Sequence, residues 1–266
     1  MSVHEGYSFQ RGGLPLLLSV PHDGRGIPED LRARMTPAGL DIPDTDWHVA
    51  RLYDFAHAEG ASVIVAHWSR YVVDLNRSPD DGVLYPGQLV TGLCPAHTFA
   101  GDPIYRDGQG ISPEERAARV ETYWRPYHDR ILATLDEFRS RFGYALLWDA
   151  HSIPGAVPRL FDGELPVLNI GTNSGRSCPA VVEERVVQPA RESGFEFVVN
   201  GRFKGGYITR HYGDPDGRIA AIQLEIAQRA YMDESTRIYD EEKADRLRTT
   251  LKAMLSACRA GGKHAW

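Results

Sequence analysis

Short apolar runs with few interrupting polar residues constrain the fold of this chain more than any other sequence feature. A strand that is exposed on one face alternates apolar and polar residues, whereas a strand covered on both faces is almost continuously apolar. Most of the runs are of the second kind, which predicts an α/β fold: a mixed, mostly parallel central sheet with helices on both faces. The predicted strands are residues 14–20, 61–66, 71–75, 144–148, 166–170, 195–199 and 220–226.

Helical spacing of apolar residues predicts helices between and after these runs. One has Asp44 as its N-cap, and a second begins after Ser112, where a capping box is present. Pro126 should kink or interrupt the second helix. The last helix is expected over residues 240–258. Because no repeat or linker marks a boundary, we expect a single domain over residues 1–266.

Charge and composition exclude several classes of partner. The chain has 30 basic and 36 acidic side chains and no basic run, so we expect no nucleic-acid partner. No apolar run is long enough to span a bilayer, and the N-terminus lacks a signal-peptide pattern, so we expect a cytoplasmic protein that does not bind membranes. The three cysteines are widely spread and predict neither disulfides nor a cysteine zinc site. A small-molecule partner is therefore expected, and the oligomeric state stays open.

Two histidines follow predicted buried strands. His22 comes just after residues 14–20, and His151 comes just after residues 144–148. Ligands and catalytic groups gather at the carboxyl ends of strands in open α/β sheets, so we expect both imidazoles at one edge of the sheet. Imidazole is a common metal ligand, and a catalytic zinc needs three protein ligands and one open position. We predict a Zn²⁺ site, although His and carboxylate ligands also suit other divalent metals.

The third metal ligand has several candidates. Asp46 is our choice, because Asp44 can cap the following helix while Asp46 points into the site. Both aspartates could instead act only as charges that favour the helix dipole. Asp23 and His48 are weaker candidates.

Glu225 is the acidic residue of the predicted strand 220–226. Burial of an unpaired carboxylate is costly or raises its pKa, and a raised pKa suits a general base that later acts as an acid. We therefore predict that Glu225 is catalytic. A salt bridge to Arg210 or Arg229 is the alternative.

The segment 69–77, with the sequence SRYVVDLNR, places arginines on both sides of a predicted strand. Arg70 and Arg77 are an odd number of residues apart, so they converge only if the strand ends or bends before Arg77. Two guanidiniums at one cavity would bind a carboxylate and stabilise a developing negative charge, as in hydrolysis of an anionic substrate. An ion pair at a sheet edge is the alternative explanation.

The glycine-rich and cation-rich loop 201–213 is expected to cover an anion. We predict Arg210 and His211 as its substrate contacts, with ordinary surface charge as the alternative. Surface charge is sufficient to explain Arg202 and Lys204.

Motifs along nearly the whole chain resemble the N-formylglutamate amidohydrolase family. They are SVPHDG at residues 19–24, DTDW at 44–47, residues 69–77, LYPGQ at 84–88, WDAHS at 148–152, and residues 200–206, 208–213 and 223–229. More remotely, the strand ending in Asp-Leu-Asn-Arg and the His-Ser pair after a strand resemble aspartoacylases and zinc carboxypeptidases.

The resemblance implies a zinc-carboxypeptidase/phosphorylase-hydrolase-like fold and metal-dependent hydrolysis of N-formyl-L-glutamate to formate and L-glutamate, in histidine degradation. The implied roles are metal ligands for His22 and His151, general base for Glu225, carbonyl polarisation for Arg70, orientation of a metal-bound histidine for Asp74, and binding of a substrate carboxylate for Asn76 and Arg77. The remote relatives carry an H-x-x-E ligand motif, but His22 is followed by Asp-Gly-Arg, so the third ligand must come from elsewhere.

Two alternatives to this function remain from the sequence. One is an amidohydrolase for another N-acyl acidic amino acid, since pocket size is not encoded in a readable pattern. The other is a metal-free protein that binds acidic amino acids, against which the set of His22, His151 and Glu225 argues.

Overall fold

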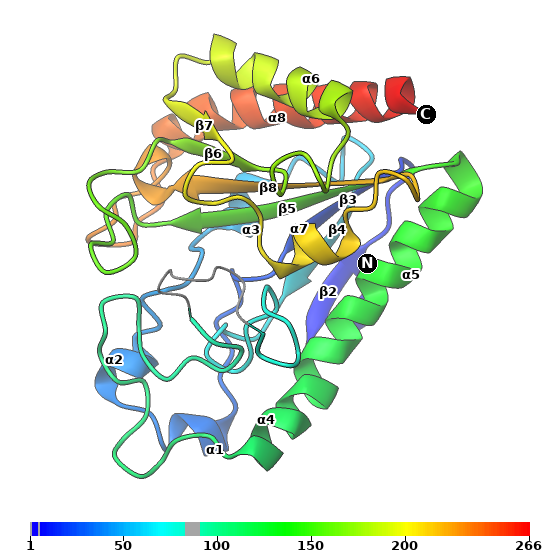
Figure 1. The fold of residues 1–266 in the computed structure, drawn as a ribbon. Coiled ribbons are helices and arrows are strands. Elements are labelled where there is room, and N and C mark those ends of the chain that lie inside the picture. The colour runs from blue at the N-terminus through cyan, green and yellow to red at the C-terminus, as the bar shows by residue number, and fades with distance from the viewer. Residues whose placement is uncertain (1, 5, 83–90) are drawn as a thin grey trace.

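The structure, a computed structural model, describes residues 2–4, 6–82 and 91–266. These residues contain an eight-stranded mixed sheet in the order β1-β2-β4-β3-β5-β8-β6-β7 (Figure 1). The central strands β4, β3, β5 and β8 are parallel to one another, and β6 is antiparallel to β8. The bounds are β1 Ser2–His4, β2 Tyr7–Gln10, β3 Leu16–Val20, β4 Ser62–Ala66, β5 Ala145–Ile153, β6 Leu168–Gly171, β7 Phe197–Val199 and β8 Ile219–Ala227.

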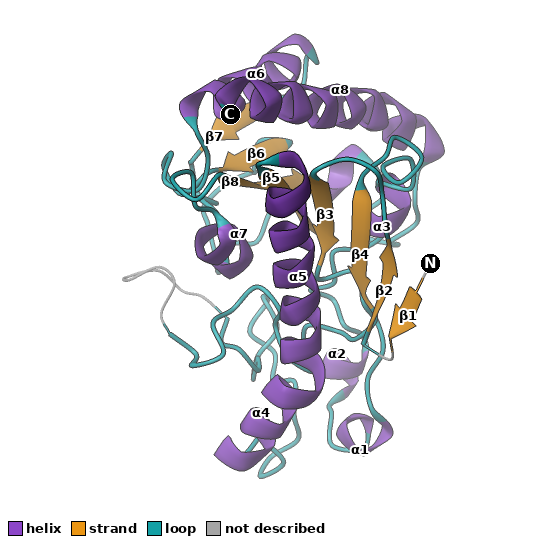
Figure 2. Cartoon of the chain, turned by 90° about the vertical axis from the view of Figure 1, so that its right-hand side faces the viewer, coloured by secondary structure: helices purple, strands orange, loops and turns teal. Residues whose placement is uncertain are grey.

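Helices cover both faces of this sheet. Helices α6 (Ala180–Glu192) and α8 (Glu241–Ala265) pack together on one face, and α5 (Arg125–Phe142) and α7 (Tyr207–Tyr212) lie on the other (Figures 1 and 2). Along β5, Trp148 belongs to the apolar core beneath α6 and α8, whereas its neighbour Leu147 belongs to the core beneath α5. This two-sided burial explains the continuous apolar runs and confirms the predicted α/β class.

Shorter helices pack beside the sheet. They are α1 (Glu29–Arg32), α2 (Pro37–Leu40), α3 (Val49–Leu52), α4 (Pro113–Arg119), the π-helical turn η1 (Val120–Trp124) and the 3₁₀ turn η2 (Gln228–Ala230). Leu31 of α1 joins Tyr71 and Ile104 in a separate apolar cluster. No helix among the residues described is both long and apolar enough to cross a membrane.

The predicted strand at residues 71–75 is wrong. The segment is a series of buried turns, in which the N–H of Val72 donates to the carbonyl of Ser69 (2.8 Å) and the N–H of Arg77 to that of Asp74 (3.2 Å). Two of its apolar side chains are buried in the core beneath α5, against the sheet, and the other two are buried in the separate cluster that contains Ile104. Burial alone therefore produces a sequence that resembles a buried strand.

The capping role predicted for Asp44 is also wrong. The backbone at the start of α3 donates to the carboxylate of Asp23, at 2.9 and 3.2 Å. Asp44 instead accepts hydrogen bonds from the hydroxyl of Tyr71 (2.6 Å) and the N–H of Phe99 (2.8 Å). The helix is only one turn long, and its first N–H groups are satisfied by a carboxylate that is distant in sequence.

The other two predicted helix starts are confirmed. The Ser112 hydroxyl accepts the N–H of Glu115 at the start of α4 (3.2 Å), and Asp240 accepts the N–H of Lys243 at the start of α8 (3.1 Å). Pro126 lies in the first turn of α5, directly after η1. Because proline has no N–H to donate, the regular helical bonding breaks there, and one wide turn joins α4 to α5.

Candidate active site

Neighbouring strands deliver four polar side chains to one face of the sheet. In the parallel pairing of β5 with β8, His151 lies opposite Glu225 and Asp149 lies opposite Gln223. Side chains alternate along a strand, so these residues share the face that carries Leu147 and the α5 core. The turn after β3 adds His22, as the positions of the two histidines in the sequence predicted.

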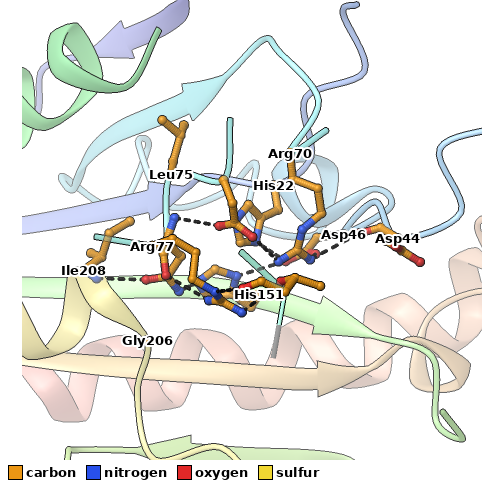
Figure 3. A network of polar contacts seen from close by, with 12 residues as sticks. His22, Asp44, Asp46, Arg70, Leu75, Arg77, His151, Gly206 and Ile208 are labelled. Carbon is orange, nitrogen blue, oxygen red and sulfur yellow. Dashed lines mark hydrogen bonds and ion pairs between the residues drawn. The ribbon is translucent and has the colours of Figure 1, made fainter. Parts of the chain in front are cut away.

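His22, Asp46 and His151 form a group that can hold a metal ion. One ligand atom from each lies within 4.8 Å of the others, and all three residues are buried. Asp46 Oδ2 lies 3.0 Å from Nδ1 of His151 and 3.7 Å from Nδ1 of His22. The three side chains converge in Figure 3.

The other candidates for the third ligand are engaged elsewhere. Asp23 accepts hydrogen bonds from the backbone at the start of α3, and Asp44 accepts those of Tyr71 and Phe99. Nε2 of His48 lies 2.9 Å from the carbonyl oxygen of Arg237. Asp46 is thus the candidate that the fold brings to the two histidines.

Each of the two imidazoles has its other nitrogen next to a second carboxylate. Nε2 of His22 lies 2.8 Å from Oδ1 of Asp74, and Nε2 of His151 lies 3.0 Å from Oδ2 of Asp149. Such contacts fix the ring and leave Nδ1 for a ligand. The contact of Asp74 with a histidine was expected, whereas that of Asp149 was missed. The available signal was its spacing, because Asp149 is two residues before His151 on a strand and so shares its face.

Arg70 is the buried cation beside this group. Its Nη2 lies 2.7 Å from Asp74 and its Nη1 lies 3.7 Å from Asp46. Burial alone would raise the pKa of Asp74, but the charges of Arg70 and His22 outweigh it and hold that pKa well below its ordinary value. Asp74 is therefore ionised at neutral pH.

The charge and donor types of the group fit a divalent metal. Burial alone would lower the pKa of His151, but Asp149 and Asp46 outweigh it and raise that pKa well above its ordinary value. For Asp46, burial is outweighed by His22 and His151, which lower its pKa. The buried carboxylates thus draw positive charge to this point. Two imidazole nitrogens and one carboxylate are suitable ligands for zinc and for several other divalent metals.

Glu225 lines the same cavity and is only 7% exposed. Its pKa is raised to about 8, mainly by burial; the charge of His151 opposes this rise and the charge of Asp46 adds to it. Nε2 of Gln223 donates to Oε2 of Glu225 at 3.2 Å. The raised pKa expected for a buried general base is therefore present.

The arginines proposed as alternative partners of Glu225 have other contacts. Nε of Arg229 lies 3.2 Å from Glu164. Nε of Arg210 donates to the carbonyl of Gly205 at 2.7 Å.

Among the residues that the structure describes, three arginines line the cavity: Arg70, Arg77 and Arg202. Arg70 and Arg77 converge because the segment between them is a series of turns. A regular strand would point the two side chains to opposite faces. Arg77 donates to the carbonyl of Thr91 (2.7 Å) and to that of Asn76 (2.9 Å). Nε of Arg70 has no hydrogen-bond partner among the residues described.

For the loop 201–213, the cavity wall contains a different cation from the two predicted in the sequence analysis. Arg202, explained there by surface charge, lies in the cavity wall, and its Nε donates to the carbonyl of Leu160 at 3.0 Å. Arg210 and His211 are not among the described residues that line the cavity. They lie on α7, whose buried residues are Ile208, Thr209 and Tyr212. Within this segment, Arg202 in the loop before α7 is therefore the described cation that lines the cavity.

Comparison with known proteins identifies the family. Residues 14–232 match the sequence profile of the family described as FGase, N-formylglutamate amidohydrolase. The chain belongs to the N-formylglutamate amidohydrolase family. It is therefore an enzyme that hydrolyses amide bonds, and the cavity of this N-formylglutamate amidohydrolase family member is its candidate active site.

Named relatives match over almost their whole length. The chain is 49% identical over 257 residues to the N-formylglutamate deformylase of Pseudomonas putida, covering 96% of each protein. It is 47% identical over 266 residues to the N-formylglutamate deformylase of Pseudomonas aeruginosa PAO1, covering 99% of this chain and 100% of the relative. The crystal structure of N-formylglutamate amidohydrolase from Ralstonia eutropha JMP134 superposes with a TM-score of 0.81 at 26% identity, covering 95% of this chain and 97% of that one.

Proposed function

We propose that this enzyme hydrolyses N-formyl-L-glutamate to formate and L-glutamate with a divalent metal as cofactor, zinc being our first choice. The observation that carries the proposal is the convergence of His22, Asp46 and His151 beside Glu225 in one cavity lined by three arginines. The names of the two Pseudomonas relatives support the choice of substrate.

His22 Nδ1, His151 Nδ1 and a carboxylate oxygen of Asp46 are the atoms that would hold the metal. A metal ion bound there would supply Lewis acidity toward the formyl oxygen and would lower the pKa of water. Asp74 and Asp149 would keep the two imidazoles oriented, because each carboxylate contacts the nitrogen that faces away from Asp46.

Glu225 is the proposed general base and acid. Its carboxylate would take a proton from the attacking water as the oxygen bonds to the formyl carbon, and would return that proton to the amine as the C–N bond breaks. The raised pKa of Glu225 favours the second transfer, because the carboxyl group holds its proton readily in this buried position.

The arginines would bind the negative charges of substrate and transition state. Arg70 would donate to the formyl oxygen as negative charge develops, and its unpaired Nε–H is an available donor. Arg77 and Arg202 would bind the two carboxylates of the glutamyl group. Arg202 replaces Arg210 and His211 in this role, because it lines the cavity.

We also propose that residues 1–266 form one amidohydrolase domain, which the single continuous sheet supports. A cytoplasmic location and a role in histidine degradation complete the proposal, and the family resemblance supports them.

Metal analysis of the purified protein, coupled to a formate assay on N-formyl-L-glutamate, tests the proposal. We expect about one zinc or comparable ion per chain, and release of formate that a chelator abolishes and added metal restores. Bound metal without formate release would contradict the substrate. A protein that contains no metal and is not activated by added zinc, manganese, cobalt or iron would contradict the mechanism. N-acetyl-L-glutamate and N-acetyl-L-aspartate serve as comparison substrates.

A further inference from the structure

Asn76 lines the cavity, but its amide contacts protein groups instead of being free for the substrate-binding role that family resemblance implies. We infer that Asn76 is a positioning residue. It holds Asp74 and Asp149, the carboxylates that contact the two metal-facing histidines, in one arrangement. The inference rests on the proposed metal-dependent hydrolysis and adds a residue role to it.

Both ends of the Asn76 amide contact protein groups. Oδ1 accepts the N–H of Ile208, a residue labelled in Figure 3, at 2.8 Å. Nδ2 lies 3.4 Å from Oδ2 of Asp149 and 3.0 Å from Nε2 of His151. Because the Ile208 N–H can only donate, it fixes which end of the amide is oxygen, and Nδ2 is the end that faces Asp149. Asn76 is only 4% exposed.

The backbone of Asn76 contacts Asp74, the carboxylate next to His22. Its N–H donates to Oδ1 of Asp74 at 2.9 Å, and the same oxygen lies 2.8 Å from Nε2 of His22. Asn76 thus contacts Asp74 through its backbone and Asp149 through its side chain. These two carboxylates lie behind His22 and His151, so the position of Asn76 controls how the two imidazoles are held relative to each other.

Asn76 also holds the start of α7. Its carbonyl oxygen accepts the N–H of Tyr207 at 3.3 Å, next to the contact of Ile208 with its side chain. A Cβ atom on Gly206 would overlap the amide of Asn76, so this approach requires glycine. The loop that carries Arg202 leads directly into this point. A substrate carboxylate at the same amide would compete with Asp149 and disturb the α7 contact.

The experiment compares zinc affinity with substrate affinity for Asn76→Ala. We expect zinc affinity, measured without substrate by competition with a chromogenic chelator, to fall about 10- to 100-fold, as for other residues that orient metal ligands. With zinc saturating, we expect kcat to fall and KM for N-formyl-L-glutamate to change less than about threefold. Arg202→Ala is the control from another part of the cavity wall, in which KM rises and zinc affinity is unchanged.

The opposite pattern would overturn the inference. Unchanged zinc affinity in Asn76→Ala, with KM raised about tenfold or more, would return Asn76 to substrate binding. If Asn76→Ala does not fold, Gly206→Ala decides, because its Cβ displaces the amide while Asn76 is retained, and unchanged zinc affinity there would also overturn the inference. Failure of the proposed function is separate, because in that case the wild-type protein itself would bind no zinc or release no formate.

Discussion

Replacement of Glu225 by glutamine should reduce activity and increase stability at the same time. The glutamine side chain has nearly the same shape and retains an oxygen that can accept the hydrogen bond from Gln223. It cannot take a proton from water. We therefore expect kcat/KM for N-formyl-L-glutamate to fall about 100- to 10,000-fold, which corresponds to about 3–5 kcal/mol in the activation free energy.

The stability change follows from the pKa of Glu225. Burial raises this pKa from an ordinary value of 4.5 to about 8, so ionisation in the folded metal-free protein is costly. The unfolded chain releases the proton above pH 4.5, and the folded chain retains it up to about pH 8, so the free energy of unfolding falls as the pH rises through this window. The cost is about 1 kcal/mol at pH 5 and about 3 kcal/mol at pH 7. Glu225→Gln removes it.

Urea unfolding of chelator-treated wild-type and variant proteins at pH 5 and pH 7 measures the second effect. The stabilisation should be larger at pH 7, and the metal content of the untreated variant should equal that of the wild type. Glu164→Gln is the control, because the Glu164 side chain is 67% exposed and its replacement should alter neither property. Wild-type turnover in Glu225→Gln would exclude Glu225 as the base. Loss of both activity and stability would show that Glu225 is needed for folding, and the reasoning would be refuted.

Three further predictions concern other residues. Arg202→Ala should raise KM for N-formyl-L-glutamate about 10- to 100-fold with a smaller change in kcat, because one charge-assisted contact to a substrate carboxylate is lost. An unchanged KM in steady-state kinetics would exclude this contact. Burial lowers the pKa of His128 from 6.5 to about 3, so on acidification the unfolded chain takes up a proton at a higher pH than the folded chain, and lowering the pH from 8 to 5 should reduce the free energy of unfolding by about 2 kcal/mol. His128→Gln should remove that part of the pH dependence in urea unfolding, and an identical pH dependence would contradict the assignment. The Phe99 ring lies 4.9 Å from the Arg70 guanidinium and lines the cavity. Phe99→Ala should therefore raise the ratio of kcat/KM for N-acetylglutamate to kcat/KM for N-formylglutamate about tenfold, and a constant ratio would show that Phe99 does not limit acyl size.

Local sequence was sufficient for the strands that build the site. The apolar runs before His22 and His151 and around Glu225 correspond to β3, β5 and β8. The position of the two histidines after their runs predicted that they meet at one edge of the sheet, and Glu225 lines the same cavity. Strand periodicity also places Asp149 on the same face as His151. These features can be read from the sequence because burial on both faces and the alternation of side chains both leave a pattern within a few consecutive residues.

Tertiary packing decided the rest. Residues 71–75 are apolar because they are buried, yet burial does not specify whether the backbone pairs with a strand or turns, and the turn is what brings Arg77 to the cavity with Arg70. Likewise, composition does not distinguish Arg202 from Arg210, because the side-chain directions of an irregular loop depend on the elements packed against it. The sequence by itself determined the buried strands β3, β5 and β8 and placed His22, His151 and Glu225 on or just after them. The tertiary structure decided which cations face the cavity and that the amide of Asn76 contacts Asp149, because these contacts join segments that are far apart in the chain.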